Sequence, residues 1–425
     1  MFNLKFSKTM KDVQWSFISL ATASFAHLLL RIVLGKELGP SGLGLYTLVF
    51  TIYMFGMQYA AFGISSALIK YVAEYNDDLP QITGFVSSGI VGSIVTGSFM
   101  SVLMYLLSGF ISIQFFHNPE MVDLLKITAL CFPFIAMQKA VLGTLNGLRK
   151  MKWYAIVNIA QHGSVMAVSI ALVMLLNMGV KGAVIGLVAP TIVVGPLSLI
   201  LIREYFASEQ AVLRTVLKKV LWFGFYIVLA DSIGMLNVQI DSLMVGHFMN
   251  EIEVGYYAVA ILFVEGLRLI PDSVQKIITP AIANYHGKND YRNINKLIKI
   301  SVLRVFVITL FASLSILLLG QFLIEVLFRE DFLSAYEPLL ILLVGSLIYG
   351  PISSINGTLP GIGKVNVMFK ISLICALMNV VLNIFLIPKY GITGAAIATS
   401  TSLIFTALVR VYFIKLYIPK LPYIA

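Results

Sequence analysis

The sequence predicts an all-α membrane protein with about twelve transmembrane helices in two repeated halves of six. Of its 425 residues, 59% are hydrophobic and only 12% are charged, whereas a soluble domain carries about 25% charged residues. So few charges cannot coat a water-facing surface of this size, and the apolar residues come in long runs. Cys131 and Cys375 lie inside such runs, so we expect packed thiols rather than a disulfide.

The predicted spans are apolar stretches of roughly 20 residues, the helical length that crosses a hydrocarbon core about 30 Å thick. They lie near 14–34, 42–69, 83–113, 122–146, 153–176, 181–202, 220–246, 253–275, 297–328, 336–357, 365–387 and 392–414. Turn-forming residues such as Gly39-Pro40 and Pro388-Lys389-Tyr390-Gly391 separate them. The first apolar stretch is long and lacks a convincing cleavage site, so we expect it to be retained as a span.

The distribution of basic residues predicts the orientation. With the N-terminus in the cytoplasm, 19 of the 30 Lys and Arg fall in cytoplasmic segments, four in the opposite loops and seven inside spans. This bias predicts a multi-pass protein of the cytoplasmic (plasma or inner) membrane with both termini inside. The net charge of +10 is then explained by loops that face anionic lipid, and no nucleic-acid partner is expected.

Short motifs recur at about half the chain length. The matched pairs, at shifts of 211, 210 and 212, are Gly44-Leu45-Tyr46 with Gly255-Tyr256-Tyr257, Asn146-Gly147 with Asn356-Gly357, and Gly182-Ala183 with Gly394-Ala395. Six spans in each half give a parallel repeat about an axis along the membrane normal. We predict one lobe over residues 1–205 and a second over 206–425, joined by the charged segment 203–219. Such lobes are typical of transporters that alternate access by rocking.

Seven basic residues fall inside spans, where an ionisable group marks a pathway or site by default. Four lie within about two turns of a span end, where a long side chain can snorkel to the interface, and we favour this interpretation over a functional role. They are Lys126, Arg304, Lys370 and Arg410. Arg31, Arg268 and Lys139 lie deeper and are the candidate phosphate-binding residues. Arginine suits phosphate because its planar fork makes paired hydrogen bonds.

Acidic residues inside spans concentrate in the second half. Asp231, Asp241 and Glu265 are the candidates for ion pairing or for a coupling Na⁺ or H⁺. The repeat shift places Arg31 at Ser242, beside Asp241, so the two could pair between lobes, or each could be satisfied within its own lobe. Glu265 lies three residues before Arg268, which also permits a local pair.

The sequence carries no soluble catalytic motif and no P-loop, so we expect neither an enzyme nor direct ATP use. The five histidines show no metal-ligand spacing. His27 and His162 fall in spans, where packed neutral side chains are the expected state. No cofactor is predicted apart from a coupling ion.

Four segments carry a resemblance to a known family. They are Leu34-Gly35-Lys36-Glu37-Leu38-Gly39-Pro40-Ser41-Gly42-Leu43-Gly44-Leu45-Tyr46, Ile240-Asp241-Ser242-Leu243-Met244-Val245-Gly246 through Val254-Gly255-Tyr256-Tyr257, Pro271 through Pro280-Ala281-Ile282-Ala283, and Asn379-Val380-Val381-Leu382-Asn383 through Gly391-Ile392-Thr393-Gly394-Ala395-Ala396. Together they resemble polysaccharide-export flippases of the Wzx type, in the multidrug/oligosaccharidyl-lipid/polysaccharide exporter superfamily.

This resemblance covers nearly the whole chain and implies two six-helix lobes around a cationic cavity. It also implies translocation of a lipid-linked oligosaccharide to the outer leaflet. Arg268 matches a functional arginine before the span 8 proline of the related lipid II flippases, and Arg31 matches a span 1 arginine less securely. The extra C-terminal spans of lipid II flippases are absent here, which favours the oligosaccharide branch.

Three functions follow as hypotheses. The first is a flippase for a lipid-(pyro)phosphate-linked oligosaccharide, with Arg31, Arg268 and Lys139 at the phosphate and with glycan polymerase or assembly proteins as further partners. The second is a cation-coupled multidrug exporter of the MATE type that depends on Asp231, Asp241 and Glu265. The third is a membrane scaffold for glycan-assembly enzymes, which would tolerate neutralisation of every one of these charges.

Overall fold

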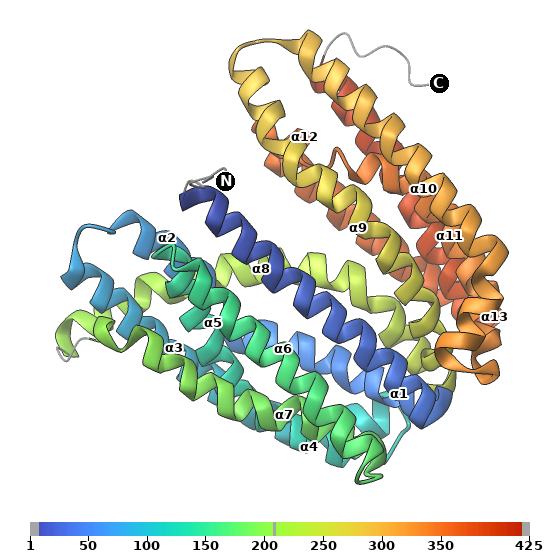
Figure 1. Cartoon of the computed structure of the whole chain (residues 1–425), viewed down its shortest axis with the longest axis horizontal. Helices are drawn as coiled ribbons and strands as arrows, with labels where there is room; N and C mark the ends of the chain where they lie inside the picture. Colours follow the sequence, from blue (N-terminus) through green and yellow to red (C-terminus); the bar gives the residue numbers. More distant parts are fainter. Residues whose placement is uncertain (1–7, 207–209, 419–425) are drawn as a thin grey trace, which may run out of the picture. The chain divides into compact units, whose positions relative to one another are not determined.

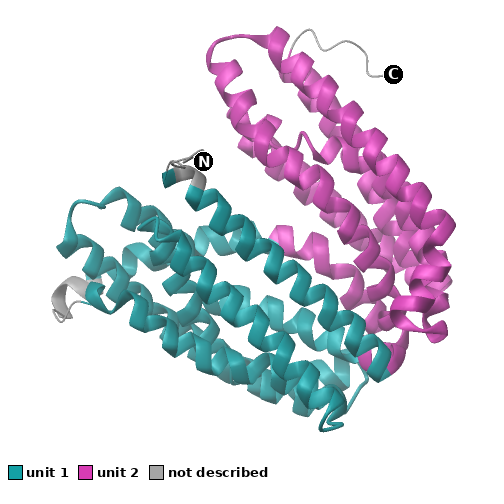
Figure 2. Cartoon of the chain, in the orientation of Figure 1, with its two compact units in different colours: residues 1–38, 45–232 teal, residues 39–44, 233–425 magenta. Residues whose placement is uncertain are grey.

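A computed structural model describes residues 8–206 and 210–418, and every regular element in them is a helix (Figure 1). The chain forms two compact units (Figure 2). Unit 1 consists of residues 1–38 and 45–232, and unit 2 of residues 39–44 and 233–425. The lobe boundary at 205–206 stays a prediction, and residues 207–209 of the predicted linker lie outside the described residues.

The helices of unit 1 alternate long spans with short or bent pieces. They are α1 (Lys8–Ala61, except 39–44), α2 (Ile64–Glu74), α3 (Leu79–Gly109), η1 (Phe110–Phe115), α4 (Met121–Ala129), α5 (Phe132–Gly147), α6 (Met151–Met174), α7 (Gly179–Ser198), η2 (Leu199–Tyr205) and the first part of α8 (Gln210–Phe248). Its apolar core lies mainly between α2, α3 and α5.

Unit 2 contains residues 39–44 of α1, the second part of α8 from Ile233, and the remaining helices. They are α9 (Glu251–Gly287), α10 (Tyr291–Phe328), η3 (Glu330–Ala335), α11 (Tyr336–Ser353), α12 (Thr358–Gly361) and α13 (Val365–Tyr417). Its core gathers apolar side chains of α9, α10 and α13. Cys131 and Cys375 are both buried free thiols, which confirms the prediction.

The predicted number of spans is consistent with the structure. Among the described residues, nine helices are long and apolar enough to cross a membrane, or ten if α4 and α5, which meet at 45°, form one bent span. Non-helical glycines divide two of these helices, α1 at Gly39 and α13 at Gly391. With those divisions the helices correspond to the twelve predicted stretches.

Glycine is needed at both divisions because each has a positive φ that other residues rarely adopt. Gly39 has φ 66° and ψ −172°, and Gly391 has φ 60° and ψ −140°. Each lies in a turn that the sequence predicted, beside Pro40 and three residues after Pro388 respectively. The backbone therefore reverses between consecutive spans without a long loop.

The repeated glycines mark close contacts within unit 2. A Cβ atom on Gly44 would overlap the carbonyl oxygen of Glu251, and one on Gly255 would overlap the carbonyl oxygen of Pro40. Pro40 and Glu251 are themselves related by the repeat shift of 211. The two helix starts therefore cross with matching contacts on both sides, as a two-fold repeat requires. The Ser41 hydroxyl also donates to Glu251 Oε1 at 3.4 Å.

The second repeated pair has equivalent surroundings in the two units. A Cβ on Gly147 would lie 3.2 Å from the carbonyl oxygen of Ile69, while one on Gly357 would overlap the Thr279 side chain. Ile69 and Thr279 also differ by 210 in number. The glycines of the repeat are therefore explained by close helix packing, as small residues are elsewhere in membrane helices.

Replacing Gly255 by alanine is expected to lower the free energy of unfolding by about 1–3 kcal/mol, because the new methyl group must displace backbone at the crossing. The measurement is the thermal unfolding temperature of the purified protein in detergent. Gly266→Ala, on the same helix, is the matched control, since a Cβ at that position would have no described atom beyond its own backbone within 4 Å. Equal unfolding temperatures for the two variants would show that the crossing is loosely packed.

Candidate functional site

Asp241 is the centre of a buried polar cluster in unit 2. It lies on α8 and is only 5% exposed. Its carboxylate accepts hydrogen bonds from Asn383 Nδ2 at 2.6 Å, Thr399 Oγ1 at 2.5 Å and the Tyr257 hydroxyl at 3.1 Å. Two helices, α9 and α13, thus supply three donors to one carboxylate, which lowers the cost of burying its charge.

The same cluster presents further oxygen atoms. Asn379 Oδ1 accepts from Asn383 Nδ2 at 3.1 Å, whereas the buried Oδ1 of Asn383 accepts no hydrogen bond from the described residues. Asn379 and Asn383 are one turn apart on α13, so both reach the Asp241 carboxylate region from one helix face. Carboxylate, amide and hydroxyl oxygens are ligands of hard cations. Within the described residues no group of three His, Cys, Asp or Glu could hold a metal ion.

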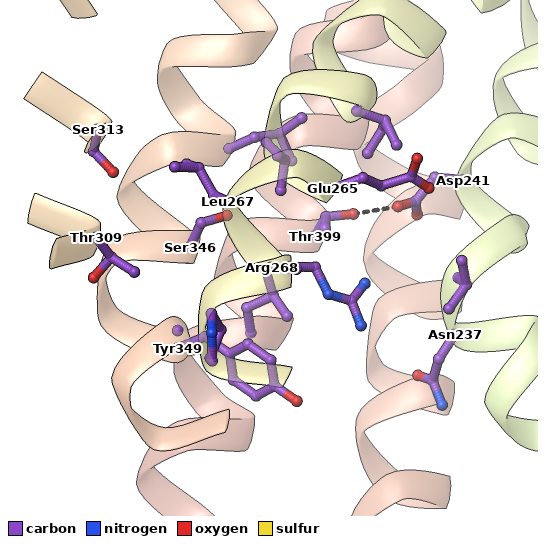
Figure 3. A pocket seen from close by; sticks show the side chains of 17 residues that line it. Asn237, Asp241, Glu265, Leu267, Arg268, Thr309, Ser313, Ser346, Tyr349 and Thr399 are labelled. Atoms are coloured by element: carbon purple, nitrogen blue, oxygen red, sulfur yellow. Dashed lines mark hydrogen bonds between the residues drawn. The ribbon is translucent and has the colours of Figure 1, made fainter. Parts of the chain in front are cut away.

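A cavity of about 80 Å³ opens beside this cluster within unit 2 (Figure 3). Asp241, Glu265 and Arg268 all line it, so the structure brings three of the six predicted site residues together. Arg268 is exposed and Glu265 half-buried. The remaining polar lining residues are Asn237, Thr309, Ser313, Ser346, Tyr349 and Thr399.

Arg31 and Lys139 belong to a second polar cluster, in unit 1. His27 and Arg31 are one turn apart on α1 and interact electrostatically, while Lys139 on α5 interacts with His162 on α6. The ring centroids of His27 and His162 lie 5.5 Å apart, so the His27–Arg31 pair and the Lys139–His162 pair are neighbours. All four side chains are half-buried. α5 and α6 contain no acidic residue, so the charge that they add to this cluster is the basic Lys139.

Asp231 does not join the other predicted acids. It lies on the part of α8 that belongs to unit 1, is exposed, and accepts from Gln58 Nε2 at 3.2 Å. The cavity near Asp241 does not include it. Asp231 and Asp241, ten positions apart on one helix, thus lie in two different environments. The proposed pairing of Arg31 with Asp241 stays a prediction.

The snorkelling interpretation is wrong for Arg410. Its side chain is only 8% exposed, and it donates to the Tyr349 hydroxyl at 3.0 Å and to Asn356 Oδ1. Distance from a span end suggested an interfacial side chain, but Arg410 points inward on α13. Sequence reasoning also missed Asn383, Thr399 and the His27–His162 pair; the spacing of Asn379 and Asn383 within an apolar run was the available signal.

Comparisons with known proteins agree with this architecture. The model of the family described as "Polysaccharide biosynthesis protein" matches residues 9–274, and the MatE model matches residues 227–385. The "Putative O-antigen transporter" of Shigella flexneri is 23% identical over 416 residues, which cover 94% of this chain and 96% of that relative.

Two solved structures share the fold. The lipid II flippase MurJ in its inward closed conformation superposes with a TM-score of 0.78 at 20% identity, over 95% of this chain and 87% of MurJ. An inward-facing multidrug resistance MATE family transporter of the MOP superfamily gives 0.75 at 15% identity, over 95% and 98% of the two chains. The predicted MATE/MOP-like helical fold is confirmed.

Proposed function

Because this chain belongs to the polysaccharide biosynthesis protein family, we propose that it is a flippase for a lipid-(pyro)phosphate-linked oligosaccharide. It moves the glycan from the cytoplasmic to the outer leaflet by alternating access, without a chemical step. The observation that carries the proposal is the presence of basic side chains inside the spans of each unit, because a phosphate within a membrane requires fixed positive charge.

In unit 1 the phosphate ligands are Arg31 and Lys139, with His27 and His162 between them as further hydrogen-bond donors. In unit 2 the ligand is Arg268, whose guanidinium offers two parallel donors to phosphate oxygens. The lipid tail stays in the bilayer during transport, so these residues need hold only the head group.

The Asp241 cluster is the site proposed for the coupling cation, Na⁺ or H⁺. The buried carboxylate supplies the negative charge, and Asn383 Oδ1, which has no partner in the part of the chain that the structure describes, is an available ligand. Glu265 lines the adjoining cavity and is the second acid within reach. A cation bound here would remove one negative charge beside Arg268. The cation and the phosphate would therefore favour each other's binding.

The proposed location is the cytoplasmic membrane, with both termini in the cytoplasm and the basic loops against anionic lipid. Proteins that polymerise or assemble the glycan are the proposed partners on either side of translocation. The multi-pass helical fold supports the membrane assignment.

The second candidate function is cation-coupled multidrug export. The match of residues 227–385 to the MatE model favours it, as does the buried Asp241 carboxylate. Cationic drugs need acidic side chains in the cavity, and Asp241 and Glu265 both line it. A scaffold without transport activity has no observation in its favour beyond the duplicated architecture.

The test uses proteoliposomes that contain a fluorescent lipid-pyrophosphate-linked oligosaccharide. Leaflet translocation by the wild-type protein, above that of protein-free vesicles, is the expected result. The same vesicles are then loaded with a cationic dye under Na⁺ and H⁺ gradients. Ion-driven dye efflux without oligosaccharide translocation would overturn the flippase assignment and favour drug export. Activity of neither kind would favour the scaffold.

A further inference from the structure

Arg410 is a buried cation whose described neighbours do not include a carboxylate partner. It is 8% exposed and donates to Asn356 Oδ1 and, at 3.0 Å, to the Tyr349 hydroxyl. Its guanidinium carbon also lies 5.6 Å from the centroid of the Tyr349 ring. These neutral partners satisfy hydrogen bonds but leave a positive charge inside the helical bundle of unit 2, where an uncompensated charge is costly.

Tyr349 connects Arg410 to the cavity that Arg268 also lines. Its hydroxyl oxygen accepts from Arg410 Nη1 and, at 3.3 Å, from Asn356 Nδ2. Two donors therefore occupy the acceptor side of the phenol, while its own hydrogen is donated to none of the described residues. Arg410 also polarises the phenol, which makes that hydrogen a stronger donor. Tyr349 lines the cavity, as Figure 3 shows.

Two further hydroxyls of the cavity have no hydrogen-bond partner among the described residues. They are the buried Oγ atoms of Ser346 and Ser313, residues that are 8% and 7% exposed. Ser346 is one turn before Tyr349 on α11, so both project from the same helix face. Figure 3 shows Ser346, Tyr349 and Arg268 around the same cavity. Buried polar atoms are normally hydrogen-bonded, so these two hydroxyls are available to donate to a group in the cavity.

We propose that this cavity binds a phosphoryl group, with Tyr349 and Ser346 donating to its oxygens and Arg268 pairing with its charge. Arg410 is a positioning residue that acts through Tyr349. It supplies a second positive charge, which is separated from the phosphoryl group by the Tyr349 hydroxyl. The proposal rests on the proposed function in taking the lipid-linked (pyro)phosphate as the natural ligand. The recognition itself requires only a phosphoryl anion.

The acids of the cavity bear directly on this proposal. Asp241 and Glu265 line the same space, so with both ionised they balance Arg268 and Arg410. A cation in the Asp241 cluster offsets one of these negative charges and leaves the cavity net positive. The phosphoryl group is therefore expected to bind more tightly in Na⁺ than in a salt of a bulky organic cation.

The local test places a fluorinated tyrosine at position 349 of the full-length protein in detergent and follows its ¹⁹F resonance during titration with inorganic pyrophosphate. A saturable shift is expected at position 349. The control carries the same label at Tyr412, which is 64% exposed on α13, the helix of Arg410. An unmoved resonance at position 349 up to millimolar pyrophosphate, or an equal shift at position 412, would overturn the proposal.

The Tyr349→Phe variant keeps the ring and removes the hydroxyl. It is expected to weaken pyrophosphate binding about tenfold or more, the loss typical of one hydrogen bond to a charged group.

Arg410→Met is expected to weaken binding in the wild-type background but to add nothing in the Tyr349→Phe background. An equal loss in both backgrounds would show that Arg410 does not act through Tyr349. If Arg410→Met does not fold, the ¹⁹F titration of the protein labelled at position 349 tests the phosphoryl site without this variant.

This experiment can fail independently of the flippase assignment. Oligosaccharide translocation without a shift at position 349 would remove the phosphoryl site from this cavity and leave the flippase function in place. A saturable shift in a protein that does not move oligosaccharide would establish the anion site and remove the proposed function.

Discussion

Arg268→Ala is expected to abolish glycan export in cells that depend on this chain, while the protein still inserts in the membrane. The side chain is exposed in the unit 2 cavity, so its removal should cost little stability. In the proposed site it provides paired hydrogen bonds to a charged group, each of which contributes about 1.5–3 kcal/mol. Their loss corresponds to a decrease of roughly 100-fold or more in transport. The measurement is surface glycan per membrane-inserted protein.

Two companion variants sharpen this prediction. Arg268→Lys keeps the charge but loses the planar fork, so an intermediate rate is expected. Lys276→Ala, on the same helix and outside the cavity, is expected to export normally. Normal export by a well-inserted Arg268→Ala protein would remove Arg268 from the binding site. Equal defects in the Arg268 and Lys276 variants would point to general charge loss on α9.

Asp241→Asn is expected to abolish the response of the protein to the proposed coupling cation. In the wild type a bound cation should raise the thermal unfolding temperature, because any ligand that binds only the folded state stabilises it. The asparagine keeps the size of the side chain but lacks the charge that holds the cation. The measurement compares unfolding in Na⁺ and in choline salts, and across pH for a proton.

Asp241→Ala is expected to have a larger effect on folding. Thr399, Asn383 and Tyr257 would lose their common acceptor, and each buried donor left unsatisfied costs about 1–3 kcal/mol. Asp272→Asn, at an exposed position on α9, serves as the control and is expected to behave as wild type. A cation response that persists unchanged in Asp241→Asn would place the coupling site elsewhere.

The fold was predictable because lipid imposes simple rules on sequence. Apolar stretches of sufficient length and turn residues between them predicted the spans, including the divisions at Gly39 and Gly391. The repeat also predicted which glycines are equivalent. It did not predict why they are glycines, because the contacts of Gly44 with Glu251 and of Gly255 with Pro40 join segments about 210 residues apart.

The site was only partly predictable for a related reason. A charge within a span can be recognised from sequence, but the direction of its side chain cannot. Arg410 has the same spacing from a span end as a snorkelling residue, yet it contacts Tyr349 on another helix. Asp241 was recognised, whereas its donors Asn383 and Thr399 lie 142 and 158 residues away. The hydrogen-bond partners of a neutral polar residue in an apolar run can be identified only when helix packing is known.

The most direct test of the central claim is leaflet translocation of a lipid-pyrophosphate-linked oligosaccharide in proteoliposomes, with wild type and Arg268→Ala at equal reconstituted amounts. Translocation by the wild type and its loss in the variant are the predicted results, and they would establish both the flippase activity and its cationic site. Equal translocation by the two proteins, or none by a folded wild type, would contradict the account.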